Sequence, residues 1–131
     1  MNHYKREDIL QIAEEEDVEF IRLQFTDMYG NLKNIAITAR ELPRAMANKY
    51  KVDSSYIAGV ASEGDQDMVL YPDPDNFIIL PWRPQQGKVA RMLCDIYRPD
   101  GTPLSKSTRY MLKKIAGEAA EEGYTCMVAP A

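Results

Sequence analysis

The sequence predicts an α+β domain in which a β-hairpin, a helix packed across it and further strands form a roll. Apolar and polar residues alternate on both sides of a glycine-containing turn between Phe20 and Thr38, as in two half-buried strands. Helical spacing of apolar residues occurs before this hairpin and again near the end of the chain, with strand-like runs between Pro- and Gly-containing turns. A length of 131 residues suits one such domain with a short appendage.

The first half of the chain is predicted to place a helix on either side of the hairpin. Lys5–Glu16 carries apolar side chains on one helical face and charged side chains on the other, and its acidic end, Glu14–Asp17, is interpreted as solvated. Glu41–Lys49 is predicted to be a short helix, with proline tolerated in its first turn. The hairpin turns near Gly30, and its inward side chains are predicted to be Ile21, Leu23, Phe25, Ile35 and Ile37.

The second half begins with a segment, Tyr50–Asp67, that shows no clear periodicity and is rich in small and polar residues. We expect a loop there that is functional or mobile, and in an isolated chain the least ordered internal segment. Strands are predicted at Met68–Tyr71, Phe77–Leu80, Val89–Ile96 and Tyr124–Val128. Thr108–Glu122 is predicted to be a helix that ends at Gly123 and has an apolar face running from Met111 to Ala119.

Composition excludes several classes of protein. The net charge is -4 and basic residues are scattered, so we expect no nucleic-acid partner. No apolar run approaches the roughly 20 residues that cross a membrane, and the charged N-terminus is not a secretory signal. Cys94 and Cys126 each lie in an apolar run and are interpreted as small buried residues of a reducing compartment, so we expect a cytoplasmic protein. The single histidine, His3, cannot complete a zinc site.

Several segments in order resemble the N-terminal region of the glutamine synthetase family. They are RLQFTDMYGNLKN, DMVLYPD and KVARMLCDIYRPDGTP, followed by Arg109. The resemblance covers almost the whole chain. It implies a β-grasp domain over residues 1–103 and the truncated beginning of the family's catalytic domain over residues 104–131.

This resemblance also implies an activity for the complete enzyme. Glutamine synthetases are ATP-dependent glutamate–ammonia ligases that use Mg²⁺ or Mn²⁺ and form homo-oligomeric rings with active sites between subunits. The nucleotide and metal residues of the family lie beyond this chain, and Ala131 stands where the family carries a metal-binding glutamate. We therefore expect no cofactor or metal in the chain, no ligase activity of the chain alone, and a role in building the ring.

The loop between Tyr50 and Asp67 carries the predicted site. Where the family has Asp-Gly-Ser-Ser, this chain reads Asp53-Ser54-Ser55-Tyr56. By resemblance, Asp53 helps bind ammonium in the neighbouring subunit's active site, and Ser55, Tyr56 and Asp67 belong to the same substrate loop. An ionised carboxylate only accepts hydrogen bonds and therefore suits a compact cation that donates them.

Two positions in the loop leave other interpretations open. Ser54 replaces a glycine that can supply a positive φ, and Tyr56 replaces a serine and would fill or reshape a small cation pocket. These changes favour a γ-glutamyl ligase that uses a larger amine. The ending at Ala131 favours a third hypothesis, a non-enzymatic β-grasp module that binds a protein. A loop aspartate such as Asp53 also often caps a turn, and Asp65 and Asp67 are typical of solvated acids.

Three further expectations concern single residues. Trp82 is interpreted as a core or interface anchor. Asp53 is expected to be exposed to solvent. Tyr56 is also typical of a residue at a subunit contact.

Overall fold

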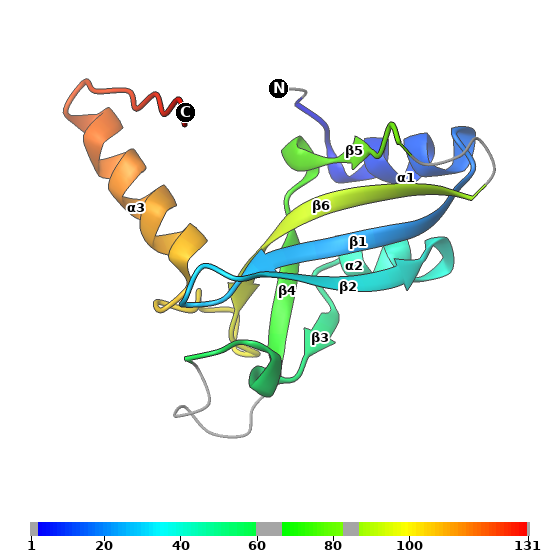
Figure 1. Cartoon of the computed structure of the whole chain (residues 1–131), viewed down its shortest axis with the longest axis horizontal. Helices are drawn as coiled ribbons and strands as arrows, with labels where there is room; N and C mark the ends of the chain where they lie inside the picture. Colours follow the sequence, from blue (N-terminus) through cyan, green and yellow to red (C-terminus); the bar gives the residue numbers. More distant parts are fainter. Residues whose placement is uncertain (1–2, 60–66, 83–86, 131) are drawn as a thin grey trace.

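The computed structural model describes residues 3–59, 67–82 and 87–130. Figure 1 shows a curved sheet with short helices on one side and a longer helix projecting away from it. The helices are α1 (Arg6–Glu15), α2 (Leu42–Met46) and α3 (Thr108–Glu121). The strands are β1 (Val18–Thr26), β2 (Leu32–Thr38), β3 (Tyr50–Val52), β4 (Met68–Pro72), β5 (Ile78–Ile79) and β6 (Lys88–Tyr97).

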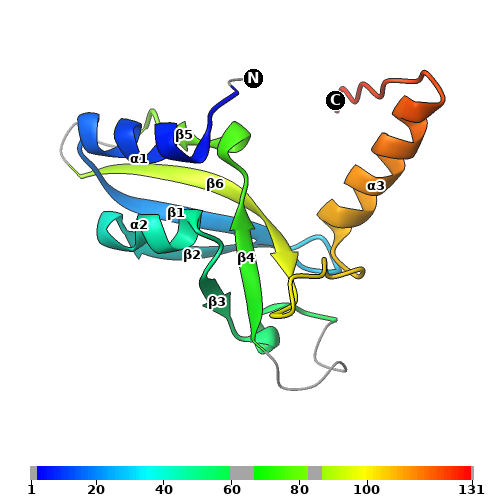
Figure 2. The same cartoon turned by 180° about the vertical axis from the view of Figure 1, so that it is seen from behind.

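These described strands form one mixed sheet in the order β2-β1-β6-β4-β3, with β5 paired to β6. The pair β1–β6 is parallel, and the other pairs are antiparallel. Helices α1 and α2 cover the same face of the sheet, as Figure 2 shows from behind. Helices lie beside a largely antiparallel sheet, which confirms the predicted α+β class.

The predicted hairpin is confirmed. Strands β1 and β2 pair in antiparallel register with Ile21 opposite Ile37 and Leu23 opposite Ile35. Ile21, Leu23, Phe25 and Ile37 are buried, and Ile35 is half-buried at the edge of the core. Alternation with period two places these side chains on the face that α1 and α2 cover.

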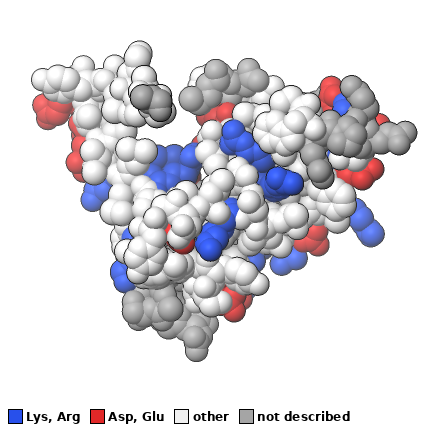
Figure 3. Space-filling model, in the orientation of Figure 1, with Lys and Arg blue, Asp and Glu red and all other residues white. Residues whose placement is uncertain are grey.

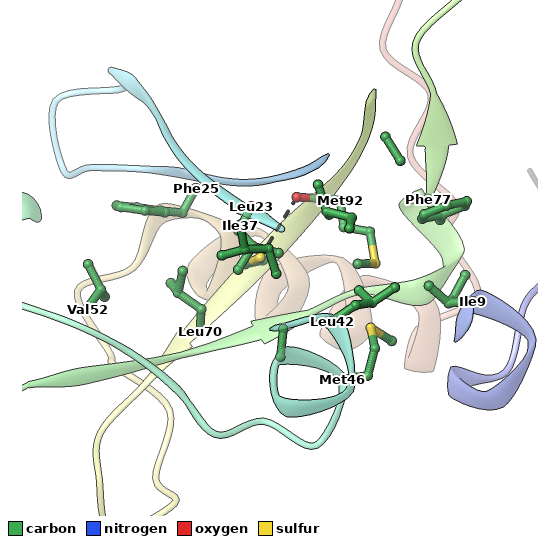
Figure 4. Packing of buried hydrophobic residues seen from close by; sticks show 14 of the residues in the cluster. Ile9, Leu23, Phe25, Ile37, Leu42, Met46, Val52, Leu70, Phe77 and Met92 are labelled. Atoms are coloured by element: carbon green, nitrogen blue, oxygen red, sulfur yellow. Dashed lines mark hydrogen bonds between the residues drawn. The ribbon is translucent and has the colours of Figure 1, made fainter. Parts of the chain in front are cut away.

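The core lies between that face and the helices. Figure 4 shows Leu23, Met92 and Leu70, from three different strands, packed with Leu42 and Met46 of α2. Helix α1 adds Ile9, which has no exposed surface. The core therefore joins segments from both halves of the sequence.

Helix α2 begins one residue later and ends three residues earlier than predicted. A 3₁₀ turn over Ala39–Glu41 precedes it, and Pro43 lies in its first turn as expected. Asn48 has a φ of 58°, a left-handed conformation that asparagine tolerates and that ends a helix. The helix prediction at Glu41–Lys49 is thus right in type and wrong in its bounds.

Helix α3 is tied to the sheet mainly by an ion cluster. The guanidinium of Arg109 donates from Nε to Asp95 Oδ1 at 2.9 Å and also pairs with the Asp73 carboxylate. Lys113 Nζ lies 2.6 Å from Asp95 Oδ2. Thr108 adds a hydroxyl contact of 2.8 Å with Thr26. The apolar face of the helix is exposed, with Leu112 and Ile115 more than half accessible.

Two sequence predictions for the C-terminal segment are wrong. Residues Tyr124–Val128 are not a strand, because nothing in the described chain pairs with them and a strand needs a ladder partner. Cys126 in that segment is exposed, although Cys94 is buried as predicted and both thiols are free. Trp82 is 74% exposed, so it is not a core residue, and its role as an interface anchor stays a prediction.

Candidate functional site

The predicted loop is more regular than its composition suggests. Tyr50–Val52 forms strand β3, which pairs with β4 from Tyr50↔Leu70 to Val52↔Met68. Ser54–Tyr56 then forms one 3₁₀ turn. Val52 and Ile57 are buried and anchor this stretch, so the prediction of an irregular loop is wrong for residues 50–56. Asp65 and the rest of residues 60–66 lie outside the described residues, as does Ala131.

Asp53 caps the 3₁₀ turn and is exposed, as predicted. Its Oδ1 accepts a hydrogen bond of 2.8 Å from the backbone N–H of Ser55. This bond, together with one from the Ser55 side chain, lowers the pKa of Asp53 below its ordinary value. Asp53 is therefore an anion at neutral pH. The capping role that the sequence left open is present, and it leaves the carboxylate facing solvent.

Ser54 needs no glycine-like backbone. It lies in a right-handed 3₁₀ turn and does not have a positive φ. Its side chain is buried, with 5% of the residue exposed. Serine in place of the family's glycine therefore causes no backbone strain at this position, because the conformation is one that any L-residue adopts.

Asp53 and Tyr56 line one shallow groove of about 350 Å³. The other lining residues are Asn34, Ile35, Tyr50, Lys51 and Val52, from β2 and β3. Tyr56 is 63% exposed, so its phenol lies at the open side of the groove rather than in the core. The groove thus combines one carboxylate, two phenols and one lysine, a set that can bind polar groups and a cation.

The other two predicted site residues lie near this groove but do not line it. Ser55 is exposed on the 3₁₀ turn and acts through its hydrogen bond to Asp53. Asp67 is exposed directly before β4. Because Val52 pairs with Met68, Asp53, which follows β3, and Asp67, which precedes β4, both lie just beyond the last pair of the β3–β4 ladder and share one end of the sheet.

A second loop meets this segment, and sequence patterns did not reveal the contact. The backbone N–H of Met28, in the β1–β2 turn, donates to the carbonyl of Ala58 at 3.3 Å. Gly59 has a φ of +94° and lies directly against the Met28 side chain. A tertiary contact between two loops leaves no periodic signal, although the positive φ required at Gly59 is one that glycine readily adopts.

Within the described residues, no group of three or more His, Cys, Asp or Glu side chains could hold a metal ion. His3 lies 3.6 Å from Asp75, as a single exposed pair. The described residues therefore do not fit a resident divalent metal, which needs several carboxylate or imidazole ligands.

Basic side chains do not gather into one patch on the face shown in Figure 3. Those of the described residues lie there in separate groups among uncharged and acidic ones. No helix among the described residues is long and apolar enough to cross a membrane.

The fold and site define an α+β domain of the β-grasp kind that presents a capped acidic turn beside a groove. The family model described as "Glutamine synthetase, beta-Grasp domain" matches residues 17–99. The chain therefore belongs to the glutamine synthetase family, as the resemblance predicted.

Comparison with individual proteins agrees with this family. The chain is 50% identical to a glutamine synthetase of Clostridium saccharobutylicum over 130 residues. This match covers 99% of this chain and 29% of that protein. A structure described as "Apo GmaS without ligand" is similar with a TM-score of 0.78 and 30% identity, over 88% of this chain and 26% of that one. A cryo-EM structure of Plasmodium falciparum glutamine synthetase shares the fold, with a TM-score of 0.79 and 20% identity over 94% of this chain and 24% of that one. The chain thus spans under a third of the length of such relatives.

Proposed function

We propose that this chain is the N-terminal part of a glutamine synthetase, an ATP-dependent glutamate–ammonia ligase of glutamine biosynthesis in the cytoplasm. Residues 1–103 form the β-grasp domain, and residues 104–131 begin the catalytic domain. The domain helps build a homo-oligomeric ring and supplies Asp53 to the neighbouring subunit's active site. The observation that carries this proposal is an exposed aspartate with a lowered pKa that caps a 3₁₀ turn, in a chain 50% identical to a glutamine synthetase.

The chemistry proposed for Asp53 is recognition of ammonium. Its carboxylate is ionised, accepts hydrogen bonds and stabilises a positive charge nearby. We further propose that the same carboxylate accepts the proton that ammonium loses before it attacks a γ-glutamyl group. ATP and the divalent metal act at residues outside this chain, so the chain alone is expected to have no ligase activity.

The experiment is a chimeric enzyme in which residues 1–130 replace the matching region of the Clostridium saccharobutylicum protein. Asp53→Ala should raise the KM for ammonium by at least about tenfold, or about 1.4 kcal/mol, with less than a twofold change in the KM for ATP. The matched control is Asp100→Ala, because Asp100 is also an exposed aspartate that caps a turn and has a lowered pKa. An ammonium KM that does not change in Asp53→Ala would show that the aspartate is only a cap.

A γ-glutamyl ligase for a larger amine is the second candidate. It is favoured by Tyr56, whose exposed ring lines a groove far larger than ammonium requires. In the chimera, Tyr56→Ser should then lower kcat/KM for an alkylamine and raise it for ammonium. If Tyr56→Ser changes neither value, the tyrosine does not select the amine.

The third candidate is a non-enzymatic binding module, and the exposed apolar face of α3 is compatible with it. A chimera that folds, assembles and binds ATP but uses neither ammonium nor an alkylamine would favour this candidate over both ligases.

A further inference from the structure

The turn between β1 and β2 is built around one buried carboxylate. Asp27 has 1% of its surface exposed. Its Oδ1 accepts hydrogen bonds of 2.9 Å from the backbone N–H groups of Tyr29 and Asn31, and its Oδ2 accepts one of 3.0 Å from the Asn31 side chain. The backbone N–H of Asp27 also donates to the carbonyl of Asn31, and its carbonyl accepts from the N–H of Gly30. A turn with this many fixed bonds holds its side chains in one position.

Met28 lies in this turn, and its side chain packs against Gly59. A Cβ added at Gly59 would overlap Met28 Sδ and lie 2.9 Å from both Cβ and Cγ of Met28. The sulfur is at the flexible end of the side chain, whereas Met28 Cβ moves only if the turn moves. The Met28–Ala58 hydrogen bond of 3.3 Å joins the same two loops through their backbones.

This contact fixes the far end of the segment that carries the proposed site. Its near end is fixed by the β3–β4 ladder, which stops at Val52. Between these ends, Ser54 and Ile57 point inward and are buried, while Asp53, Ser55 and Tyr56 are exposed. The exposed residues therefore lie on a short segment that is fixed at both ends, by the β3–β4 ladder and by the contact with Met28.

We propose that the Asp27 turn is a positioning element for the substrate loop, and that Met28 supports Ala58–Gly59 by direct contact. This contact keeps the 3₁₀ turn in the orientation that directs Asp53 and Tyr56 outward. This role rests on the proposed function of Asp53 as an amine-binding residue. Asp27, Met28 and Gly59 act through the loop and do not touch the amine.

Two glycines of the chain provide a matched test. Gly59 and Gly101 both have a left-handed φ, +94° and +88°, so alanine is strained at either position. Of these two glycines only Gly59 has a close neighbour, because nothing lies within 4 Å of a Cβ at Gly101. Gly101 lies in the turn after β6, outside the Asp27 turn, so any difference between Gly59→Ala and Gly101→Ala reports the contact with Met28.

The first measurement is amide hydrogen exchange on the 131-residue chain. The Tyr56 and Ile57 amides close the 3₁₀ turn by bonding to the carbonyls of Asp53 and Ser54. In Gly59→Ala these two amides should exchange at least about tenfold faster than in Gly101→Ala, with the amides of the β1–β6 pair unchanged. Equal exchange rates of these two amides in the two variants would overturn the proposed support of the loop by Met28.

The second measurement separates positioning from simple stability. In the chimeric enzyme, Gly59→Ala and Asp27→Asn should raise the KM for ammonium by about fivefold or more, while the KM for ATP stays within about twofold. Gly101→Ala should change neither KM. Faster exchange with an unchanged ammonium KM would overturn the positioning role. An unchanged KM in Asp53→Ala would instead refute the proposed function on which this role rests.

Discussion

Arg109 holds the first turn of α3 against the sheet, and replacing it with methionine tests how this helix is attached. The variant keeps most of the side-chain volume and removes the charge. It leaves the carboxylates of Asp73 and Asp95 with one remaining cation, Lys113. Both carboxylates and the guanidinium are largely buried, with 18% and 22% of their side-chain surfaces exposed.

The size of the effect follows from these contacts. Hydrogen bonds between charged groups contribute about 1.5–3 kcal/mol each when removed, and partial exposure lowers that value. Two such bonds are lost, and Lys113 compensates in part, so we expect about 2–3 kcal/mol of lost docking free energy. A helix of 14 residues is marginally stable by itself, so α3 should open and fray once it is released.

The assay is amide exchange across the chain, compared with Lys114→Met on the same helix. A loss of about 2 kcal/mol corresponds to about thirtyfold faster exchange of α3 amides in Arg109→Met. The amides of β1 and β6 should keep their rates, because the core does not involve α3. Equal α3 exchange in the two variants would refute the account of the ion cluster. Unfolding of the whole sheet by Arg109→Met would show instead that the cluster belongs to the core.

Three other predictions concern the core, the thiols and acid stability. Leu23→Ala should destabilise the chain by about 2–5 kcal/mol in urea unfolding, and Leu32→Ala, at an exposed site on the partner strand, by less than about 0.5 kcal/mol; similar losses would contradict the assigned core. Burial raises the pKa of the Cys94 thiol, so a maleimide at pH 7 should label the native chain once, at the exposed Cys126, and double labelling would contradict the burial of Cys94. Burial of Asp27 raises its pKa, but its hydrogen bonds to Asn31 and Tyr29 outweigh this and the net pKa is lowered. Its stabilising effect is therefore complete above the unfolded pKa of about 3.9 and is lost as pH falls through the folded value, so Asp27→Asn should flatten the acid-unfolding curve below about pH 4; an unchanged curve would contradict the role of these bonds.

The hairpin could be predicted from sequence because its signal is local. Seven paired residues alternate on each strand, and the turn contains a glycine with a φ of 81°. Helix α3 was also predicted to within one residue, since its apolar spacing and the glycine after it are local features as well. Local patterns of this kind need no knowledge of the partner segment.

The predictions failed where pairing is set by distant residues. Strand β3 has three residues in a polar segment, and its partner β4 follows only after an intervening loop, so periodicity could not reveal it. Tyr124–Val128 has the composition of a strand but no partner among the described residues. The contact between Met28 and Gly59 could not be predicted for the same reason, because a contact between two loops depends on the folded geometry.

The exposure of Asp53 and its cap of a turn could be predicted from the sequence, whereas its role in a site stays a prediction. Its hydrogen bonds with Ser55, which lower its pKa, follow from that cap. The regular backbone on either side of Asp53 could not be predicted, since Val52 and Ile57 anchor it through contacts with the core. Composition alone therefore underestimated the regular structure around Asp53.

The central claim is that Asp53 serves a neighbouring subunit, and mixed rings test it most directly. Chimeric subunits with Asp53→Ala and an intact catalytic part are mixed with subunits that keep Asp53 but carry an inactivated catalytic part. If Asp53 acts on the neighbour, mixing creates sites with both components, and a fraction of the activity should regain the low ammonium KM of the parent chimera. Mixed rings that keep the high KM of the Asp53→Ala enzyme throughout would contradict the claim.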